Sequence, residues 1–364
     1  MKGVRPQHFK VWQETNSFLM TPNSQFTLPP EWAPQSAVML TWPHAYDEWA
    51  PFLEEIDPVF VNIARAIAPR EKVLITCYDA EHQAHVGHLL KKAQVELDQV
   101  RFGIAKSNDI WVRDHGPITV LTAQHRPLLL DFEFNAWGGK YDLAHDNWIT
   151  RTLHQQKVFG STPLQHIDFT LEGGGIEVDG QGTLLATESV LLSATRNKIQ
   201  KEELQANLKQ WFNIDRVLWL KNGYLAGDDT DGHIDTLARF TDAHTVAYAT
   251  CEDPNDPHYP VLRAMEAELA GFRDYQGNPY RLVGLPIPQQ QYSSEGELLP
   301  ATYANFLIIN EAVLLPIYGD PMDSVALARL QGCFPTRKVI PIQCRVLINL
   351  YGSLHCATMQ LPKG

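Results

Sequence analysis

The chain has 364 residues, of which 44% are hydrophobic and 20% charged, a composition typical of a soluble globular protein with enough apolar material for a large core. Its formal net charge of −12 argues against nucleic acid as a partner, because phosphate binding requires a basic surface, and it favours a cationic ligand. No apolar run reaches the length of about 18 residues that a transmembrane helix needs, and the N-terminus lacks the apolar segment of a signal peptide. We therefore expect no membrane association and a cytoplasmic location.

Strands and helices alternate along the chain after a polar lead-in segment over residues 1–28. This alternation favours an α/β or α+β fold over a helical bundle. No linker divides the chain, so we expect a single domain over residues 1–364. In chain order, the expected strands lie at 37–42, 72–77, 100–104, 118–120, 128–132, 176–178, 183–187, 237–240, 245–248, 306–309, 313–316 and 357–359, and the expected helices at 51–68, 80–93, 198–212, 259–270 and 323–330.

A unit made of a turn, a strand, a tight turn and a second strand recurs along the chain. Its leading turns carry Asp114, Glu172, His233, Asn305 and Cys356, which follow one another at intervals of roughly 60 residues. Helical stretches fill the gaps, so the spacing suggests a repeated hairpin-plus-helix unit arranged around an axis. Hairpins at such intervals also occur in α/β proteins without repeats. The longest irregular segments are residues 252–260 and 285–302, and the second is long enough for a lid or an ordered binding loop.

The cysteines exclude a disulfide scaffold. They are odd in number, widely spread and free of any C-x-x-C pair, which favours reduced thiols over disulfides or a zinc knuckle. The five positions are Cys77, Cys251, Cys333, Cys344 and Cys356.

Cys356 is the first candidate for chemistry. It follows a turn marked by Gly352 and Ser353, close to the end of the chain. A cysteine is more often a buried small hydrophobe than a nucleophile. On a strand, the neighbouring His355 would point to the opposite face, so a catalytic base has to come from elsewhere in the chain.

His233-Ile-Asp235 offers such a base. On a strand both side chains would leave the same face, so the carboxylate could orient the imidazole. A metal-binding H-x-D pair and a core histidine remain alternatives. Asp228, Asp229 and Asp231 stand just before this pair, and their spacing does not match an EF-hand.

Two further segments combine acids with turn residues. Glu172-Gly-Gly-Gly175 is neither a P-loop nor a dinucleotide fingerprint, and its glycines either allow close approach of backbone and ligand or form a tight strand entry. Asn108–Pro117 holds Asp114 at a turn beside Trp111 and Arg113, which alternatively form a structural ion pair and a core tryptophan. A third segment, with His82, His85 and His88, reads as a helix surface because no acid or cysteine joins the histidines.

A thiol, an imidazole and several carboxylates together suit a small cation with an electrophilic carbon. The thiolate attacks, the imidazole moves protons and the carboxylates hold the positive charge. A guanidinium group matches this description better than other common metabolite groups.

Together the motifs resemble the agmatine deiminase and bacterial-type peptidylarginine deiminase family, within the guanidino-group modifying superfamily, over nearly the whole chain. The resemblance implies a five-fold pseudosymmetric α/β propeller of pentein type, with the site on its axis. One departure is the segment Asn349-Leu-Tyr-Gly-Ser-Leu-His-Cys356, where the family usually has a run of glycines. The motifs that carry the resemblance are Leu28-Pro-Pro-Glu-Trp32, Thr41-Trp-Pro-His44, Asn108–Pro117, Glu172–Ile176, Gly232-His-Ile-Asp235, Tyr303-Ala-Asn-Phe306, Tyr318-Gly-Asp-Pro321 and Leu354-His-Cys356.

Carried over by position, the resemblance implies Cys356 as the nucleophile and His233 as the general acid and base. It also implies that Asp114 and Asp235 hold the guanidinium nitrogens and that Glu172 assists His233. We add Trp111 and Asp229 to the expected substrate-binding residues, with Asp229 or its neighbour Asp228 facing the second cation of the substrate.

The expected reaction is hydrolysis of agmatine to N-carbamoylputrescine and ammonia through a covalent thiouronium intermediate on the cysteine, without metal or organic cofactor. A peptidylarginine or free-arginine deiminase is the alternative within the same chemistry. A metal-dependent amidohydrolase with His233 and Asp235 as ligands, or a guanidine sensor without catalysis, belongs to other classes. A homo-oligomer is left open.

Overall fold

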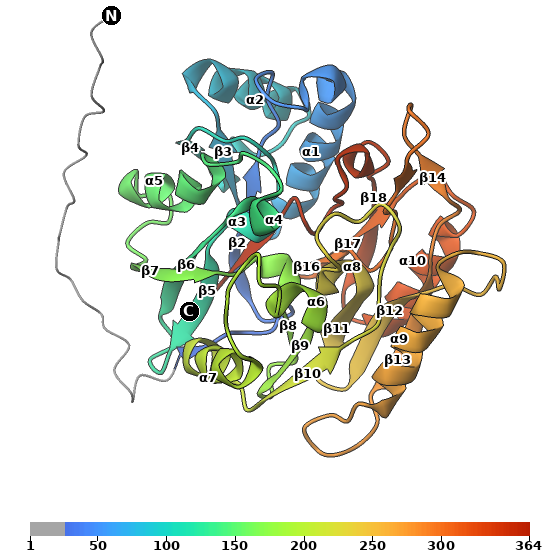
Figure 1. Ribbon diagram of the computed structural model, residues 1–364. Helices are drawn as coiled ribbons and strands as arrows, with labels where there is room; N and C mark the ends of the chain where they lie inside the picture. Colours follow the sequence, from blue (N-terminus) through green and yellow to red (C-terminus); the bar gives the residue numbers. More distant parts are fainter. Residues whose placement is uncertain (1–25) are drawn as a thin grey trace, which may run out of the picture.

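The computed structural model describes residues 26–364, which form a mixed α/β fold of several small sheets with helices around them (Figure 1). Of the lead-in segment expected over residues 1–28, residues 1–25 lie outside the described part of the chain. Its end is regular, because β1 (Phe26–Thr27) pairs antiparallel with β5 (Ile118–Thr122). None of the described helices combines the length and the apolar character that a membrane crossing requires.

One pattern of strand pairing recurs in five of the six sheets formed by residues 26–364. In each of the five, two strands form an antiparallel pair, and a third strand runs parallel to the second. These trios are β19 (Met359–Pro362), β2 (Gln35–Thr41) and β3 (Lys72–Cys77); β5, β6 (Pro127–Glu133) and β7 (Leu164–Thr170); β8 (Glu177–Val178), β9 (Thr183–Thr187) and β10 (Arg216–Leu220); β11 (Ala238–Asp242), β12 (Thr245–Thr250) and β13 (Arg281–Pro286); and β16 (Leu307–Ile309), β17 (Ala312–Ile317) and β18 (Lys338–Gln343).

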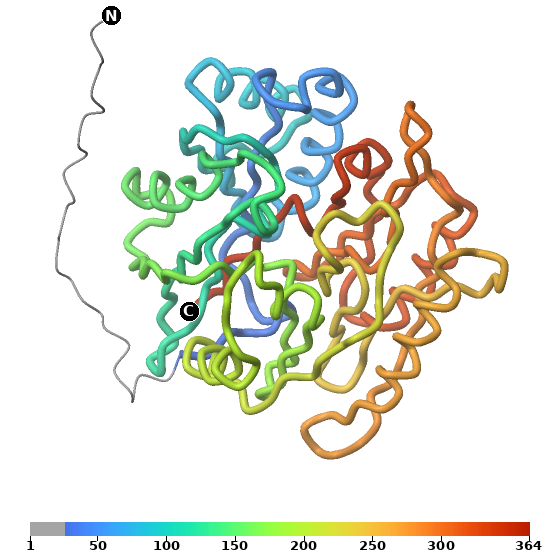
Figure 2. The backbone as a smooth tube through the Cα atoms, in the orientation of Figure 1, coloured from blue at the N-terminus to red at the C-terminus, as the bar shows by residue number. Residues whose placement is uncertain are grey.

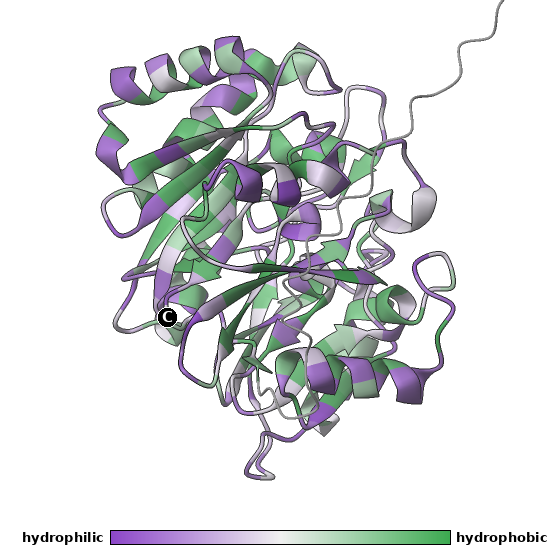
Figure 3. Cartoon of the chain, turned by 90° about the vertical axis from the view of Figure 1, so that its left-hand side faces the viewer, coloured by the Kyte–Doolittle hydropathy of each residue, from purple (hydrophilic) through white to green (hydrophobic). Residues whose placement is uncertain are grey.

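A helix connects the second and third strand of each trio, as a parallel pair requires a crossover. The five crossover helices are α1 (Leu53–Ile67), α5 (Ile149–Gln155), α7 (Lys201–Phe212), α9 (Tyr259–Gly271) and α10 (Asp323–Cys333). The helices present hydrophilic faces outward, whereas the strands between them are largely hydrophobic (Figure 3). The remaining elements are β4 (Val100–Ile104), which extends the sheet of β3, and α2 (Ala80–Lys92), α3 (Val112–His115), α4 (Ala136–Gly139), α6 (Glu188–Leu191) and α8 (Ile234–Leu237), with 3₁₀ turns η1 (Ala50–Phe52), η2 (Leu97–Gln99), η3 (Asp146–Trp148), η4 (Gly173–Gly175) and η5 (Leu347–Leu350).

Helix α1 shows why apolar periodicity located these elements well. Its core residues recur every three or four positions and lie on one face, so the helix buries that face against the sheet. Their side chains have at most 6% exposure: Ile56, Val59, Phe60, Ile63 and Ile67. They join the largest apolar cluster of the described residues, which also contains Trp42, Tyr303 and Phe306.

The segment expected to be irregular over residues 285–302 is partly regular. Strand β13 continues to Pro286, and β14 (Gln291–Tyr292) and β15 (Leu298–Leu299) form a small antiparallel hairpin. The turn of this hairpin is held by Ser293, whose backbone N–H donates to the carbonyl oxygen of Glu297 over 2.8 Å. The segment over residues 252–260 ends where α9 begins at Tyr259.

The five trios place a short turn directly before each antiparallel pair. The turns are α3 before β5, η4 before β8, α8 before β11, residues 303–306 before β16 and residues 353–358 before β19. The strands β2 and β19, near the two ends of the described chain, run side by side (Figure 2). The anchors read from the sequence therefore occupy equivalent places, one for each trio.

Candidate active site

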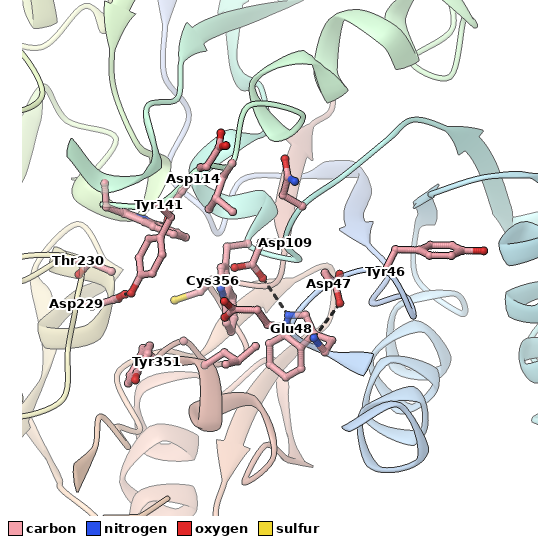
Figure 4. Close-up of a pocket in the computed structure, with 18 residues that line it drawn as sticks. Tyr46, Asp47, Glu48, Asp109, Asp114, Tyr141, Asp229, Thr230, Tyr351 and Cys356 are labelled. Carbon is pink, nitrogen blue, oxygen red and sulfur yellow. Dashed lines mark hydrogen bonds between the residues drawn. The ribbon is translucent and has the colours of Figure 1, made fainter. Parts of the chain in front are cut away.

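A cavity of about 220 Å³ opens beside Cys356 and is lined by acids and aromatic rings. The sulfur of Cys356 points into the space between Tyr141, Asp229 and Tyr351 (Figure 4). No lysine, arginine or histidine is found among the described lining residues, so the cavity suits a cation. Its six carboxylates belong to Asp47, Glu48, Asp109, Asp114, Asp142 and Asp229.

Cys356 lies in the turn before β19, almost fully buried. The side-chain amide of Asn305 donates to its Sγ over 3.2 Å, and Sγ lies 3.7 Å from Oδ2 of Asp235. Burial, together with the charges of Asp235 and Asp114, raises the pKa of this thiol well above its usual range. In the substrate-free protein Cys356 is therefore a thiol at neutral pH.

His233 stands at the N-terminus of α8 with no exposure to solvent. Its Nε2 lies 2.8 Å from Oε2 of Glu172, and its Nδ1 lies 3.6 Å from Oδ1 of Asp114. Burial alone would lower the pKa of His233, but the charges of Asp114 and Glu172 outweigh it and raise that pKa to about 9. The imidazole is thus protonated at neutral pH and can act first as an acid.

Asp114 is held in α3 by two donors. The backbone N–H of Gly174 donates to its Oδ1 and the indole of Trp137 to its Oδ2, both over 3.0 Å. Trp137 reaches this position from the left-handed turn α4, where its φ is +54°, an unfavourable conformation for a residue with a side chain. Burial raises the pKa of Asp114 to about 6.

Asp235, in α8, binds a different histidine, His355. Its Oδ2 accepts from Nδ1 of His355 over 2.8 Å, while its Oδ1 is buried without a hydrogen-bond partner among the described residues. Burial would raise the pKa of Asp235, but His355 and His233 hold it below its usual value. An ionised, unpartnered carboxylate oxygen beside a thiol is a ready acceptor for an N–H donor of a ligand.

The other ring nitrogen of His355 is bound by a second acid, Glu31. Its Nε2 lies 2.7 Å from Oε2 of Glu31, and Arg239 donates to the same oxygen over 2.7 Å. Arg239 in turn binds Glu177 over 2.7 Å, with no exposure of its own. The carboxylate next to the thiol is therefore positioned through a chain of buried charges.

Glu172, placed just before η4, is held by Arg196 as well as by His233. Nε of Arg196 donates to both carboxylate oxygens of Glu172, over 2.9 and 2.8 Å. Burial would raise the pKa of Glu172, but His233 and Arg196 keep it below its usual value. Arg196 also binds Asp231 over 2.7 Å, and Asp231 binds Lys140 over 2.8 Å.

The three aspartates before His233 have separate roles. Asp228 accepts from the backbone N–H groups of Thr230 and Gly232, so it stabilises the turn. Asp231 takes part in the ion pairs with Arg196 and Lys140. Asp229 lines the cavity and accepts from the hydroxyl of Tyr141 over 2.7 Å, and burial raises its pKa.

Trp111 lines the cavity and packs against Gly352. A Cβ at Gly352 would come within 2.4 Å of the Trp111 ring, so this backbone approaches the indole more closely than any other residue type would allow. Gly352, the single glycine in the segment before His355-Cys356, is therefore required by its close contact with Trp111.

The structure brings together the site residues expected from the sequence, but the local geometry expected for His233 and Asp235 is wrong. They belong to the helical turn α8, not to a strand, and Asp235 does not bind His233. Instead Glu172 binds His233, and His355 binds Asp235. His355 and Cys356 likewise lie in a turn, not on a strand. Sequence reasoning gave no role in the site to six residues: Glu31, Trp137, Arg196, Arg239, Asn305 and His355. Asn305 had a signal through its place in the repeat, and Glu31 and His355 lie within motifs that carry the resemblance, whereas Trp137, Arg196 and Arg239 had none.

No group of three or more histidines, cysteines, aspartates or glutamates within residues 26–364 is arranged to hold a metal ion. The three histidines of α2 do not form such a group. His82 accepts from the backbone N–H of Tyr78 over 3.0 Å, and Nε2 of His85 lies 2.8 Å from Asp57.

Comparisons with known proteins agree over nearly the whole chain. The sequence profile of the family described as Porphyromonas-type peptidyl-arginine deiminase matches residues 27–362. A solved structure from Porphyromonas gingivalis, named "Putative Arginine Deiminase", is 48% identical with a TM-score of 0.86 and covers 93% of this chain and 99% of its own. A C. jejuni agmatine deiminase, a Cys-to-Ser variant with substrate bound, is 36% identical with a TM-score of 0.87, covering 94% of this chain and 98% of its own. The agmatine deiminase of Pseudomonas syringae pv. tomato is 34% identical over 93% of this chain and 95% of its own.

Gly174→Ala should inactivate the site without unfolding the protein. A Cβ there would lie 2.6 Å from Nδ1 of His233 and 2.8 Å from Oδ1 of Asp114, so one of these groups has to move. We expect a loss of activity of about a hundredfold or more, because small displacements at a reacting centre have large effects, and a destabilisation of about 1–3 kcal/mol. Steady-state kinetics and urea unfolding measure the two effects. Gly87→Ala, on α2 with nothing within 4 Å, is the matched control and should keep full activity; full activity in Gly174→Ala would contradict the packing argument.

The raised pKa of the Cys356 thiol predicts how alkylation depends on pH and on reagent charge. Because burial and the charges of Asp235 and Asp114 raise the pKa of this thiol well above its usual range, only a small fraction of it is ionised at pH 7. The rate with neutral iodoacetamide should therefore rise about tenfold per pH unit between about pH 6 and 9. At pH 7, cationic 2-chloroacetamidine should alkylate Cys356 at least about tenfold faster than iodoacetamide does, because a bound cation favours the thiolate. A rate that levels off near pH 7 with iodoacetamide would instead indicate a preformed thiolate.

Proposed function

Because the chain belongs to the family of agmatine deiminases and Porphyromonas-type peptidyl-arginine deiminases, we propose that it hydrolyses the guanidinium group of agmatine to N-carbamoylputrescine and ammonia. The observation that carries the proposal is the buried Cys356 thiol beside Asp235, at a cavity whose lining, within residues 26–364, carries carboxylates and no basic residue. The relative with substrate bound in a Cys-to-Ser variant supports a cysteine nucleophile.

Substrate binding is assigned to the two buried aspartates. A planar guanidinium donates N–H groups in a fork that suits carboxylates. Asp235 has a free buried oxygen, and Asp114 faces the same space around Gly174. With the plane of the guanidinium held by acids, one face of its carbon is open to Cys356, and Trp111 lines the wall of the cavity.

The chemistry needs one thiolate and one proton donor. The bound cation lowers the pKa of the Cys356 thiol, which gives its proton to solvent. The thiolate attacks the guanidinium carbon, a C–S bond forms, and the C–N π electrons move onto nitrogen to give a neutral tetrahedral intermediate. The His233 imidazolium gives its proton to the departing nitrogen, which leaves as ammonia, and a thiouronium intermediate remains. Neutral His233 then takes a proton from water and is protonated again, while the hydroxide adds to the carbon. The C–S bond breaks, the hydroxyl proton passes to the departing thiolate, and N-carbamoylputrescine leaves with the Cys356 thiol restored. Glu172 stabilises both the protonated and the neutral form of His233, because it binds Nε2.

The further expectations on architecture are part of the same proposal. The five trios of strands, each with a crossover helix and a turn that carries a site residue, support a five-fold pseudosymmetric α/β propeller with the site on its axis. We propose that residues 1–364 form one catalytic domain around it. The cytoplasmic location stays a prediction, with which the five free, buried cysteines are compatible.

The alternatives differ in the tail of the substrate. Free arginine carries a carboxylate, which the acids that line the cavity repel. A peptidylarginine carries no second charge there but needs room for its backbone. Ammonia release measured on agmatine, arginine and an arginyl peptide separates these possibilities; activity on agmatine below that on arginine would overturn the proposal. A guanidine sensor would bind agmatine without releasing ammonia.

Replacement of the nucleophile should abolish turnover while the fold persists. Cys356→Ala removes the only atom that can form the C–S bond, so ammonia release should fall to the background rate, and the circular dichroism spectrum should not change. Acid-quenched mixtures of the unsubstituted protein with agmatine should contain a mass adduct on Cys356. Treatment with EDTA should leave turnover intact. Near-normal turnover of Cys356→Ala, or bound zinc whose removal abolishes activity, would favour the metal-dependent alternative with His233 and Asp235 as ligands.

Asp229 should bind the second cation of agmatine, its primary amine. A charged hydrogen bond contributes about 1.5–3 kcal/mol, so Asp229→Asn should lower kcat/KM for agmatine about tenfold to a hundredfold, with a smaller effect on butylguanidine, which lacks the amine. The ratio of the two kcat/KM values is the readout. Asp228→Asn is the control, because Asp228 only stabilises the turn and its loss should affect both substrates equally. An unchanged ratio in Asp229→Asn would place amine recognition elsewhere.

A further inference from the structure

Tyr351 has a backbone conformation that favours glycine. Its φ is +67°, in the left-handed region, at the end of η5. A residue with a side chain is found in such a conformation when the surrounding structure holds it there. Two neighbours do so: the backbone N–H of Tyr351 donates to the carbonyl oxygen of Ile348 over 3.1 Å, and the next residue, Gly352, packs against Trp111.

The side chain of Tyr351 is also fixed. Its ring packs against the largest apolar cluster, and its hydroxyl donates to Glu297, in the β14–β15 hairpin, over 3.3 Å. In Figure 4 the ring lies across the cavity from Tyr141 and beside the space into which the sulfur of Cys356 points. The ring is therefore a wall of the catalytic cavity and not a mobile surface group.

A second, larger hollow of about 670 Å³ is also lined by Tyr351. Its lining mixes apolar side chains such as Phe52 and Val59 with polar ones such as Ser293 and Arg345. Among the described residues, Tyr351 is the one that lines both hollows. We call this second hollow the outer groove.

We infer that Tyr351 is a specificity-determining residue that separates the catalytic cavity from the outer groove and so restricts the enzyme to small guanidines. A substrate with an extended tail, such as an arginine whose α-amine is acylated, would need the space that the ring fills. Discrimination here works by exclusion, because the ring opposes the larger substrate instead of binding the smaller one. The inference deepens the proposed function, on which it rests for the identity of the small substrate.

The test compares access to Cys356 in Tyr351→Gly and in the unsubstituted protein. Two reagents with the same reactive group are used, 2-chloroacetamidine and an N-benzoyl-ornithine amide that carries a chloroacetamidine on its side chain. In both, the thiolate displaces chloride and forms a C–S bond, so mass spectrometry follows the rate without any need for turnover. We expect the rate ratio of the large to the small reagent to rise at least about tenfold in Tyr351→Gly, since steric exclusion from a pocket is worth factors of this size.

Two control variants distinguish the loss of the Tyr351 ring from the loss of its hydroxyl bond and from the introduction of a glycine. Tyr351→Phe keeps the ring and loses only the hydroxyl bond to Glu297, so its ratio should stay close to that of the unsubstituted protein. Glu311→Gly introduces glycine at a similar φ of +62° in the turn between β16 and β17, far along the chain from the cavity lining, and should not change the ratio. If glycine at 351 disturbs folding, Tyr351→Asn, which tolerates the same backbone conformation, replaces it.

Catalysis gives the second readout. The ratio of kcat/KM for N-benzoyl-argininamide to that for agmatine should rise in Tyr351→Gly in step with the alkylation ratio. An alkylation ratio in Tyr351→Gly equal to that of Glu311→Gly, or an equal rise in Tyr351→Phe, would overturn the inference. Failure of the unsubstituted protein to release ammonia from agmatine would overturn the proposed function instead, while the alkylation ratio would still decide the role of Tyr351.

Discussion

The burial of Arg239 is the constraint on which the floor of the site depends. A guanidinium without solvent is strongly unfavourable unless acids pair its charge and acceptors bind its N–H groups. Glu177, Glu31 and the carbonyl oxygen of Phe306 provide that match, each over 2.7 Å, and they come from three separate parts of the chain. Because the charge has to be compensated, these segments cannot shift independently.

The same network reaches the thiol through Glu31. This carboxylate accepts from Arg239, from His355 and from the backbone N–H of Ile308. His355 lies between two carboxylates, and each of its ring nitrogens needs a proton in the bond that it makes. Two protons are therefore shared among Glu31, His355 and Asp235, whichever atoms carry them. This keeps Asp235 in one orientation with one oxygen free, next to Cys356.

Much of the fold and of the site could be predicted from the sequence, for local reasons. Apolar periodicity located α1 and β3, and the regular recurrence of turns before hairpins indicated Asp114, Glu172, Asn305 and Cys356 as equivalent anchors. The backbone of α8 was predicted wrongly, since a single turn of helix leaves no periodic signal in His233-Ile-Asp235. Partners such as Glu31 with Arg239 could not be found, because residues so far apart meet only through the closed arrangement of the sheets. The contact between Gly352 and Trp111 is of the same kind.

The pairing of β19 with β2 has a consequence for how the protein is made. Cys356 comes after every other site residue in the chain, and it reaches the site only when β19 pairs with a strand formed near the beginning. His355 comes directly before Cys356, so the imidazole that positions Asp235 and the thiol reach the site in the same step. The acids and the nucleophile are therefore brought into their final arrangement together, when β19 pairs with β2.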